Sequence, residues 1–195
     1  ISGYYGFNNI GDESILRTVI DNLREKLPQV DITVLSQSPA QTAEKYGVKA
    51  AARMSPWAIL RSIRRCDMLL SGAAASFIHG PAHRQTARAA GTALLREDPR
   101  PQLRARGPDP DHRVGGHASR SILYYLFLLR LAQLMGKRTF IYSQGIGPIF
   151  SARNRRFTAF VLRRTDGIVV RDSKSRDLLL ELGVPDHLIH VTADR

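Results

Sequence analysis

The chain has 195 residues and a formal net charge of +12, with 29 Lys and Arg against 17 Asp and Glu. This length can bury one α/β core, which argues against two full domains. The single cysteine, Cys66, excludes an internal disulfide, and the longest apolar run, at residues 122–129, is too short to cross a bilayer.

The positive charge is spread over several segments without an accompanying nucleic-acid-binding motif. Arginines gather at residues 61–65 and 153–164, and the others are scattered. We therefore expect no nucleic-acid partner and assign the charge to solvated helix faces and to attraction toward anionic surfaces or substrates.

The first predicted element is the end of a strand, followed by a glycine-rich turn at residues 3–13. The spacing of Gly3, Gly6 and Gly11 matches neither the dinucleotide fingerprint nor a Walker A loop. A strand, such a turn and a helix N-terminus together present free backbone N–H groups to a ligand. The alternative is a tight turn with ordinary capping, and the spacing does not separate the two.

The side chains of this turn favour a sugar. Tyr4 and Tyr5 offer flat amphipathic rings, and Asn8 and Asn9 add amide donors and acceptors, which suits the apolar faces and hydroxyl rim of a sugar. Asp12 is expected to cap the helix that follows, whose apolar positions at 15–27 recur every three or four residues.

Strands and helices alternate through most of the remaining chain. Helices are predicted at residues 39–46, 55–63, 119–135, 152–164 and 173–182. Strands are predicted at residues 30–36, 48–51, 66–71, 138–143, 167–170 and 188–192. This rhythm predicts an α/β fold, a Rossmann-like parallel sheet with helices on both faces.

Residues 73–118 interrupt the rhythm. The segment is rich in Ala, Arg and Pro, and its prolines forbid a continuous helix, so we expect a surface loop or a disordered insertion. It contains four histidines, at positions 79, 83, 112 and 117. Gly80 and Pro81 separate the closest pair, and no cysteine or carboxylate completes a ligand set, so we predict no metal site.

Five motifs in order resemble the polysaccharide pyruvyltransferase family, most closely its bacterial cell-wall type. They are ISGYYGFNNIGDE at 1–13, SRSILYYL at 119–126, YSQGIGP at 142–148, VRDS at 170–173 and HVTAD at 190–194. The resemblance implies a GT-B-like enzyme with two Rossmann-like domains. Residues 1–195 would then be a fragment that forms the N-terminal domain, with the C-terminal domain absent.

The resemblance also implies a reaction. A pyruvyl group passes from phosphoenolpyruvate to two hydroxyls of a sugar, which forms a ketal and releases phosphate without a cofactor. Such chemistry needs a proton donor, a general base and donors for the leaving phosphate. Asp12 and Glu13 are the candidates for the base, with helix capping as the alternative for Asp12. The donor would be held mainly by the absent domain, and the sugar acceptor could be carried by a lipid.

Further candidates follow strands at the edge where α/β sheets bind ligands. The expected substrate-binding residues are Gly3, Tyr4, Tyr5, Gly6, Asn8, Asn9, Gly11, Arg120, Gln144, Gly145, Gly147 and Arg171. Alternatively, Arg171 pairs with Asp172 on the surface while Asp172 caps a helix, and Arg120 is only solvated. Tyr124 and Tyr125 are expected to pack in the core.

One departure from the family pattern bears on activity. Relatives carry a run of glycines where this chain has alanine at positions 73–75, and methyl groups there would obstruct positive φ or substrate contact. The composition of the insertion resembles GC-rich DNA translated in a wrong frame, and a compensated frameshift is our hypothesis for its origin. Because this cleft loop is altered and the C-terminal domain is absent, we expect a fragment that is inactive alone.

Three functions therefore stay open from the sequence. They are a pyruvyltransferase domain, a GT-B glycosyltransferase domain that uses a nucleotide sugar, and a non-catalytic remnant or binding module. We expect a cytoplasmic location, where the basic residues at 153–164 could contact the inner face of the membrane.

Overall fold

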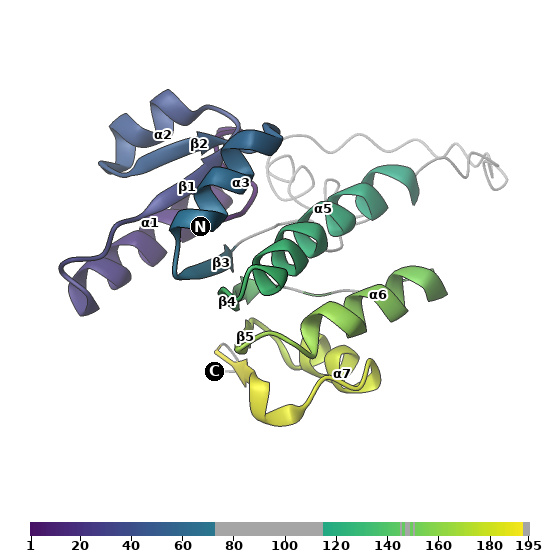
Figure 1. The fold of residues 1–195 in the computed structure, drawn as a ribbon. Coiled ribbons are helices and arrows are strands. Elements are labelled where there is room, and N and C mark those ends of the chain that lie inside the picture. Colours follow the sequence, from purple (N-terminus) through teal and green to yellow (C-terminus); the bar gives the residue numbers. More distant parts are fainter. Residues whose placement is uncertain (73–114, 145, 147–148, 150, 193–195) are drawn as a thin grey trace, which may run out of the picture.

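The computed structural model describes residues 1–72, 115–144, 146, 149 and 151–192, and for 115–121, 143 and 144 it describes the backbone alone. Its helices are α1 (Ile10–Lys26), α2 (Pro39–Tyr46), α3 (Pro56–Arg65), α5 (Gly115–Leu134), α6 (Ala152–Leu162) and α7 (Ser173–Glu181) (Figure 1). Its strands are β1 (Thr33–Ser36), β2 (Lys49–Ala52), β3 (Met68–Gly72), β4 (Arg138–Gln144), β5 (Gly167–Val170) and β6 (Ile189–Val191), with a 3-10 turn, η2 (Asp186–Leu188), before β6.

All the strand pairs are parallel, and Ser2 joins the two ladders. β1 pairs with β2, and β3, β4, β5 and β6 pair in that order. Ser2 bridges Leu35 on one side and Ser71 on the other. Its N–H donates to the Leu70 carbonyl and its carbonyl accepts from the Gly72 N–H, each at 2.8 Å. The chain at Ser2 therefore runs in the same direction as all six strands. The carboxyl ends of the strands lie at one edge of the sheet, here called the carboxyl edge.

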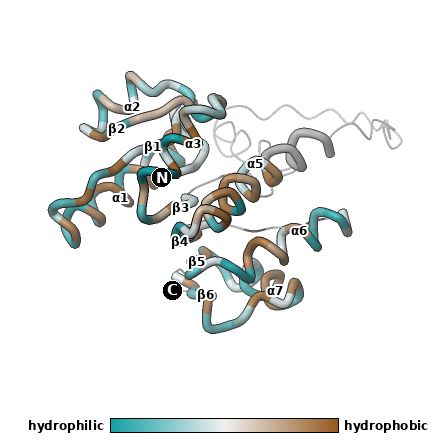
Figure 2. The backbone as a smooth tube through the Cα atoms, in the orientation of Figure 1, coloured by the Kyte–Doolittle hydropathy of each residue, from teal (hydrophilic) through white to brown (hydrophobic). Residues whose placement is uncertain are grey.

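Helices cover both faces of the sheet, as neighbouring β1 residues show. Val34 packs with Leu16 of α1 and Tyr46 of α2 in one hydrophobic cluster. Leu35, which points to the opposite face, belongs to a larger cluster built from α3, α5, α6 and α7. α5 carries the longest hydrophobic stretch of the tube in Figure 2. The predicted Rossmann-like α/β architecture is therefore confirmed.

Local signals placed several element ends correctly. α2 and β5 have the predicted bounds. Gly47, Gly136 and Gly183, which follow the ends of α2, α5 and α7, have φ values of 61°, 68° and 72°. Ser55 caps α3 by accepting a hydrogen bond from the Ala58 N–H.

Two predictions at helix starts were wrong. α1 begins at Ile10, and its cap is Asn9, whose backbone is extended and whose Oδ1 accepts from the Gly11 N–H at 3.1 Å. Asp12 lies inside the first turn, where its Oδ2 accepts from Asn9 Nδ2 at 2.7 Å. α5 begins at Gly115, so the last part of the predicted loop at 73–118 is helical. The rest of that segment lies outside the described residues.

Candidate functional site at the carboxyl edge

The glycine-rich loop, residues 3–9, leaves Ser2 at the carboxyl edge and leads into α1. Gly6 and Asn8 have positive φ values of 79° and 58°. A Cβ on Gly6 would overlap Ser36 Oγ, and one on Gly3 would overlap the ring of Tyr5. Glycine is therefore required at positions 3 and 6 by close approach, and at position 6 also by backbone conformation.

Glu13 anchors this loop to α2. Its carboxylate accepts from the Gly6 N–H at 2.9 Å, from Lys45 Nζ at 3.1 Å and from the Tyr46 hydroxyl. Burial by itself would raise the pKa of Glu13, but the three hydrogen bonds outweigh it and hold the pKa below its ordinary value. Ser38 Oγ adds a hydrogen bond to the Gly6 carbonyl at 3.2 Å. Both carboxylate oxygens of Glu13 are thus engaged in holding the loop.

Arg53 follows β2 and lies among four aromatic rings. Its guanidinium carbon is 5.7 Å from the ring centre of Tyr4, 5.1 Å from Phe7, 5.0 Å from Tyr124 and 5.9 Å from Tyr125. Tyr4 and Phe7 belong to the glycine-rich loop, whereas Tyr124 and Tyr125 belong to α5. This group, here called the Arg53 cage, joins the loop to the helix that packs on the opposite face of the sheet.

Within the described part of the chain, the guanidinium of Arg53 donates two hydrogen bonds. Nη1 donates to the Gly3 carbonyl and Nη2 to the Tyr125 hydroxyl, each at 3.4 Å, while the Tyr124 hydroxyl donates to the Arg53 carbonyl at 2.7 Å. The side chain is only 9% exposed. Among the described residues no carboxylate forms an ion pair with it, so the ring faces supply most of its stabilisation. Such a cation can accept an anionic group of a ligand.

The two tyrosines of the loop are placed differently. Tyr4 stacks on Phe7, with ring centres 4.0 Å apart, and Phe7 is 39% exposed. Tyr5 is fully buried, and its hydroxyl has no hydrogen-bond partner within the described part of the chain. Burial, together with the charge of the nearby Asp12, raises the pKa of Tyr5 well above its ordinary value. Tyr5 therefore supports the loop from beneath, and its ring is not presented to a sugar in this structure.

The loop that follows β4 lies at the same edge. β3 lies between Ser2 and β4, which ends at Gln144. The Ile146 N–H donates to Ser175 Oγ at 2.9 Å, and Ser175 Oγ donates to Asp172 at 2.8 Å. Asp172 also accepts from the Ser175 N–H and caps α7, which is one of the two alternatives left open from the sequence. This chain of contacts joins Ile146 to the start of α7.

Some of the predicted site residues are brought together and some are not. Gly3, Tyr4, Gly6, Asn8, Asn9 and Gly11 form one loop and helix start, with Asp12 buried beneath it at 2% exposure. Arg171 is exposed directly after β5, farther along the carboxyl edge. The side chains of Arg120 and Gln144, and the whole of Gly145 and Gly147, lie outside what the structure describes.

Arg53 was missed by the sequence reasoning. The signal that could have found it is its place two residues after the strand prediction at 48–51, the rule that selected Arg171. Its aromatic neighbours could not have been found this way, because Tyr4, Phe7, Tyr124 and Tyr125 are all more than 40 residues distant from it in the chain.

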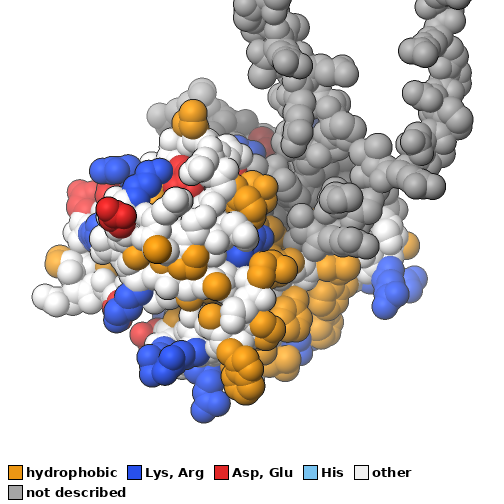
Figure 3. Space-filling view, turned by 90° about the horizontal axis from the view of Figure 1, so that it is seen from above, with side chains coloured by type: hydrophobic (Ala, Val, Ile, Leu, Met, Phe, Trp, Pro, Cys, Tyr) orange, Lys and Arg blue, Asp and Glu red, His pale blue; other side chains and the backbone are white. Residues whose placement is uncertain are grey.

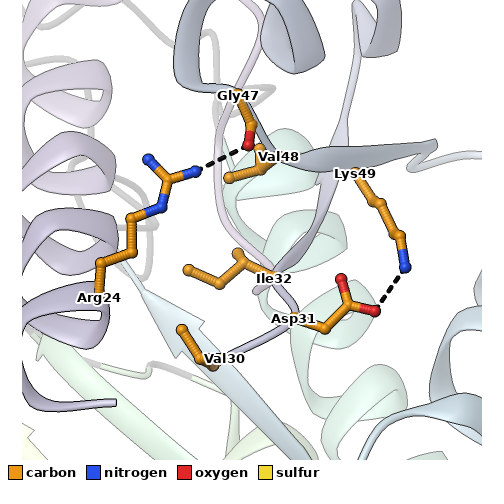
Figure 4. A pocket seen from close by; sticks show the side chains of 7 residues that line it. All are labelled: Arg24, Val30, Asp31, Ile32, Gly47, Val48 and Lys49. Carbon is orange, nitrogen blue, oxygen red and sulfur yellow. Dashed lines mark hydrogen bonds and ion pairs between the residues drawn. The ribbon is translucent and has the colours of Figure 1, made fainter. Parts of the chain in front are cut away.

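The structure also has a shallow pocket of about 270 Å³ away from this site (Figure 4). It lies beside the amino ends of β1 and β2, and it is lined by Arg24, Val30, Asp31, Ile32, Gly47, Val48 and Lys49. Arg24 donates to the Gly47 carbonyl at 2.7 Å, and Lys49 pairs with Asp31. Since Arg24 already binds a backbone carbonyl and Lys49 already pairs with Asp31, we assign no ligand to this pocket. No group of three or more potential metal ligands occurs in the described ranges.

Comparisons with known proteins agree with the motifs. The family described as polysaccharide pyruvyl transferase matches residues 9–194. The crystal structure of Anabaena HepE in complex with UDP and glucose superposes with a TM-score of 0.50 at 11% identity, covering 99% of this chain and 43% of HepE. The chain thus spans less than half the length of that protein. No curated protein sequence matches it significantly.

Proposed function

The chain belongs to the polysaccharide pyruvyl transferase family, and on this premise we propose that it takes part in moving a pyruvyl group from phosphoenolpyruvate to a sugar of a cell-wall polysaccharide precursor. The observation that carries the proposal is the family match at 9–194, which includes Asn9, the start of α1 and the segments that follow β4 and β5. The product would be a pyruvate ketal.

The atoms of this reaction balance without a redox partner. The methylene carbon of phosphoenolpyruvate takes a proton and becomes the methyl group. Two sugar hydroxyl oxygens form bonds to the central carbon, and the bond from that carbon to the phosphate oxygen breaks. One hydroxyl proton replaces the proton consumed at the methylene carbon, and the other leaves with phosphate or through a base.

The Arg53 cage supplies two of the contacts that such a reaction needs. The guanidinium of Arg53 would bind an anionic group, either the carboxylate or the phosphate of the donor or a phosphate of the acceptor. The exposed ring of Phe7, stacked on Tyr4, would pack against a sugar face, and the amides of Asn8 and Asn9 would reach its hydroxyls. Arg171 and the loop after β4 would extend the same surface.

The predicted base is proposed to be Asp12 rather than Glu13. Glu13 already binds the loop through both carboxylate oxygens, so it serves to position Gly6. Asp12 lies at the N-terminus of α1 under the loop and accepts from Asn9, the residue that we expect to contact the sugar. A ligand that engages Asn9 would change the environment of Asp12 directly.

We propose that this chain forms the N-terminal half of a GT-B-like enzyme with two domains. The alignment of this chain with less than half of HepE supports it. A second domain across the carboxyl edge would then hold most of the donor, and this chain would be inactive alone.

The test is an activity assay of the full-length protein. It would be incubated with phosphoenolpyruvate and a lipid-linked aminosugar disaccharide, and phosphate and ketal would be measured. Equal amounts of both are expected, and Asp12→Asn should abolish both while leaving the melting temperature near that of the parent. Phosphate release without ketal, or an Asp12→Asn variant with full turnover, would contradict the assignment.

A second candidate is a glycosyltransferase domain that uses a nucleotide sugar. The observation that favours it is the presence of UDP and glucose in the crystal structure of HepE. Glycosylated product from a UDP-sugar, with no ketal from phosphoenolpyruvate, would select this candidate. No product in either assay would leave a non-catalytic binding module.

A further inference from the structure

The outer surface of α3, α5 and α6 combines exposed arginines with exposed apolar side chains, and it is here called the basic face. These helices contain arginines and no Asp or Glu, whereas α1 carries Asp12, Glu13, Asp21 and Glu25 among its basic residues. The three helices share one hydrophobic cluster on the same face of the sheet (Figure 1). The guanidinium of Arg130 in α5 lies 4.9 Å from the ring centre of Phe160 in α6, so α5 and α6 are in contact at the surface.

Most arginines of the basic face make no contact that holds the fold. Arg61, Arg64, Arg153 and Arg156 are exposed, and none forms an ion pair or side-chain hydrogen bond with another described residue. Arg155 differs, because it pairs with Glu181 of α7 at 3.3 Å and marks the border of the face. The charge of the face is therefore available to a partner.

Large apolar side chains lie exposed between these arginines. Phe127 is 57% exposed and Trp57 is 81% exposed. The exposed apolar side chains of the face are Trp57, Leu123, Phe127, Leu134 and Phe160. Three of them recur at spacings of four and seven residues on α5, which places them on one stripe of that helix. From above, Figure 3 shows hydrophobic side chains in a broad band, with Lys and Arg side chains at its lower left and at its right end.

We propose that the basic face docks on an anionic lipid bilayer. Arginines without acidic neighbours are attracted to anionic headgroups, and exposed aromatic and aliphatic side chains insert at the headgroup level. A nucleic acid would bind the arginines, but it would not account for the exposed apolar side chains. A second copy of the same face would place like charges together. None of the helices in the described ranges is long and apolar enough to span a bilayer, so the contact is peripheral.

The position of the face gives the docking a purpose. Trp57 lies four residues after Arg53, and Leu123 immediately precedes Tyr124 of the Arg53 cage. A bilayer on the basic face would therefore lie beside the carboxyl edge, where a lipid-carried acceptor could reach the site. Docking itself does not rest on pyruvyl transfer, and a binding measurement that fails leaves the activity assay unaffected.

The charge is tested with vesicles of phosphatidylcholine, with and without phosphatidylglycerol. The variant Arg61→Gln, Arg64→Gln, Arg153→Gln and Arg156→Gln should lower the partition coefficient on anionic vesicles at least about tenfold. The control variant Arg17→Gln, Lys26→Gln, Lys49→Gln and Arg138→Gln loses the same formal charge from exposed positions outside the face. Two of these residues, Arg17 and Lys49, pair with Asp21 and Asp31. It should bind within about twofold of the parent protein.

The apolar part is tested with Phe127→Ser and its control Leu27→Ser, which changes an exposed leucine at the end of α1. Only the first should reduce vesicle binding several-fold, and circular dichroism checks that both fold. Equal loss in the two charge variants would overturn the proposal, since it would show attraction by net charge alone. Preference for an RNA fragment over anionic vesicles, or a dimer abolished by the four-arginine change, would overturn it as well.

Discussion

The glycine-rich loop and the basic face use polar residues in opposite ways. Glu13 of α1 and Arg53 after β2 each bind two or more groups beside the loop, and Arg53 is only 9% exposed. On the basic face, Arg61 and Arg153 are exposed and bind no described residue. Charge in the loop therefore fixes a backbone conformation, whereas charge on the face serves no folding role. The difference predicts that equal substitutions will have unequal effects on stability.

The largest effect is expected from Gly6→Ala. Its φ is 79°, and the new methyl group would meet Ser36 Oγ and lie 2.7 Å from the Ser38 nitrogen. Strain and overlap together should cost about 3 kcal/mol of unfolding free energy. Gly136→Ala is the matched control, because its φ is 68° but no atom lies within 4 Å of the added Cβ. It should cost about 1 kcal/mol, and equal costs in urea denaturation would show that packing around the loop is unimportant.

Removal of the cation from the Arg53 cage should rank second. Arg53→Gln loses contact with four ring faces and weakens two hydrogen bonds, at a cost of about 2 kcal/mol. Arg61→Gln removes the same charge from the basic face and should change stability by less than about 0.5 kcal/mol. Thermal unfolding of both variants measures the contrast. If Arg53→Gln lowered the stability no more than Arg61→Gln does, the four rings would pack equally well without the guanidinium.

The fold could be predicted from the sequence more fully than the Arg53 cage could. Alternating strands and helices, the bounds of α2 and the glycine stops follow from neighbouring residues, so local patterns were sufficient. The Arg53 cage joins rings from two distant segments, which no local pattern relates. The cap of α1 was misplaced because Asn9 and Asp12 are both suitable cap residues, and only the extended backbone at Asn9 decides between them. The start of α5 was placed too late because the preceding prolines suggested an irregular chain up to Ser119.

A smaller effect with a defined pH dependence is expected from Glu13→Gln. The pKa of Glu13 is lowered in the folded protein, so its charge stabilises the fold above the unfolded pKa, and this contribution is lost as pH falls through the folded value. At neutral pH the variant should be about 1 kcal/mol less stable than the parent. The difference should shrink below a pH of about 4.3, the ordinary value for Glu. Glu25→Gln, on an exposed turn of the same helix, is the control. If the difference in stability between the Glu13 variant and the parent stayed the same in acid, the charge of Glu13 would not be what stabilises the fold.

The smallest effect on the free energy of unfolding is expected from substitutions of the exposed arginines on the basic face. The four-arginine variant of the basic face should unfold within about 0.5 kcal/mol of the parent, because exposed charges without partners contribute little to stability. Loss of like charges from adjacent helices could make the variant slightly more stable at low salt, and added salt should remove that gain. Denaturation at two salt concentrations measures both quantities. A loss of unfolding free energy comparable to that of Arg53→Gln would show that these arginines hold the helices together. It would remove the electrostatic support for docking on an anionic bilayer.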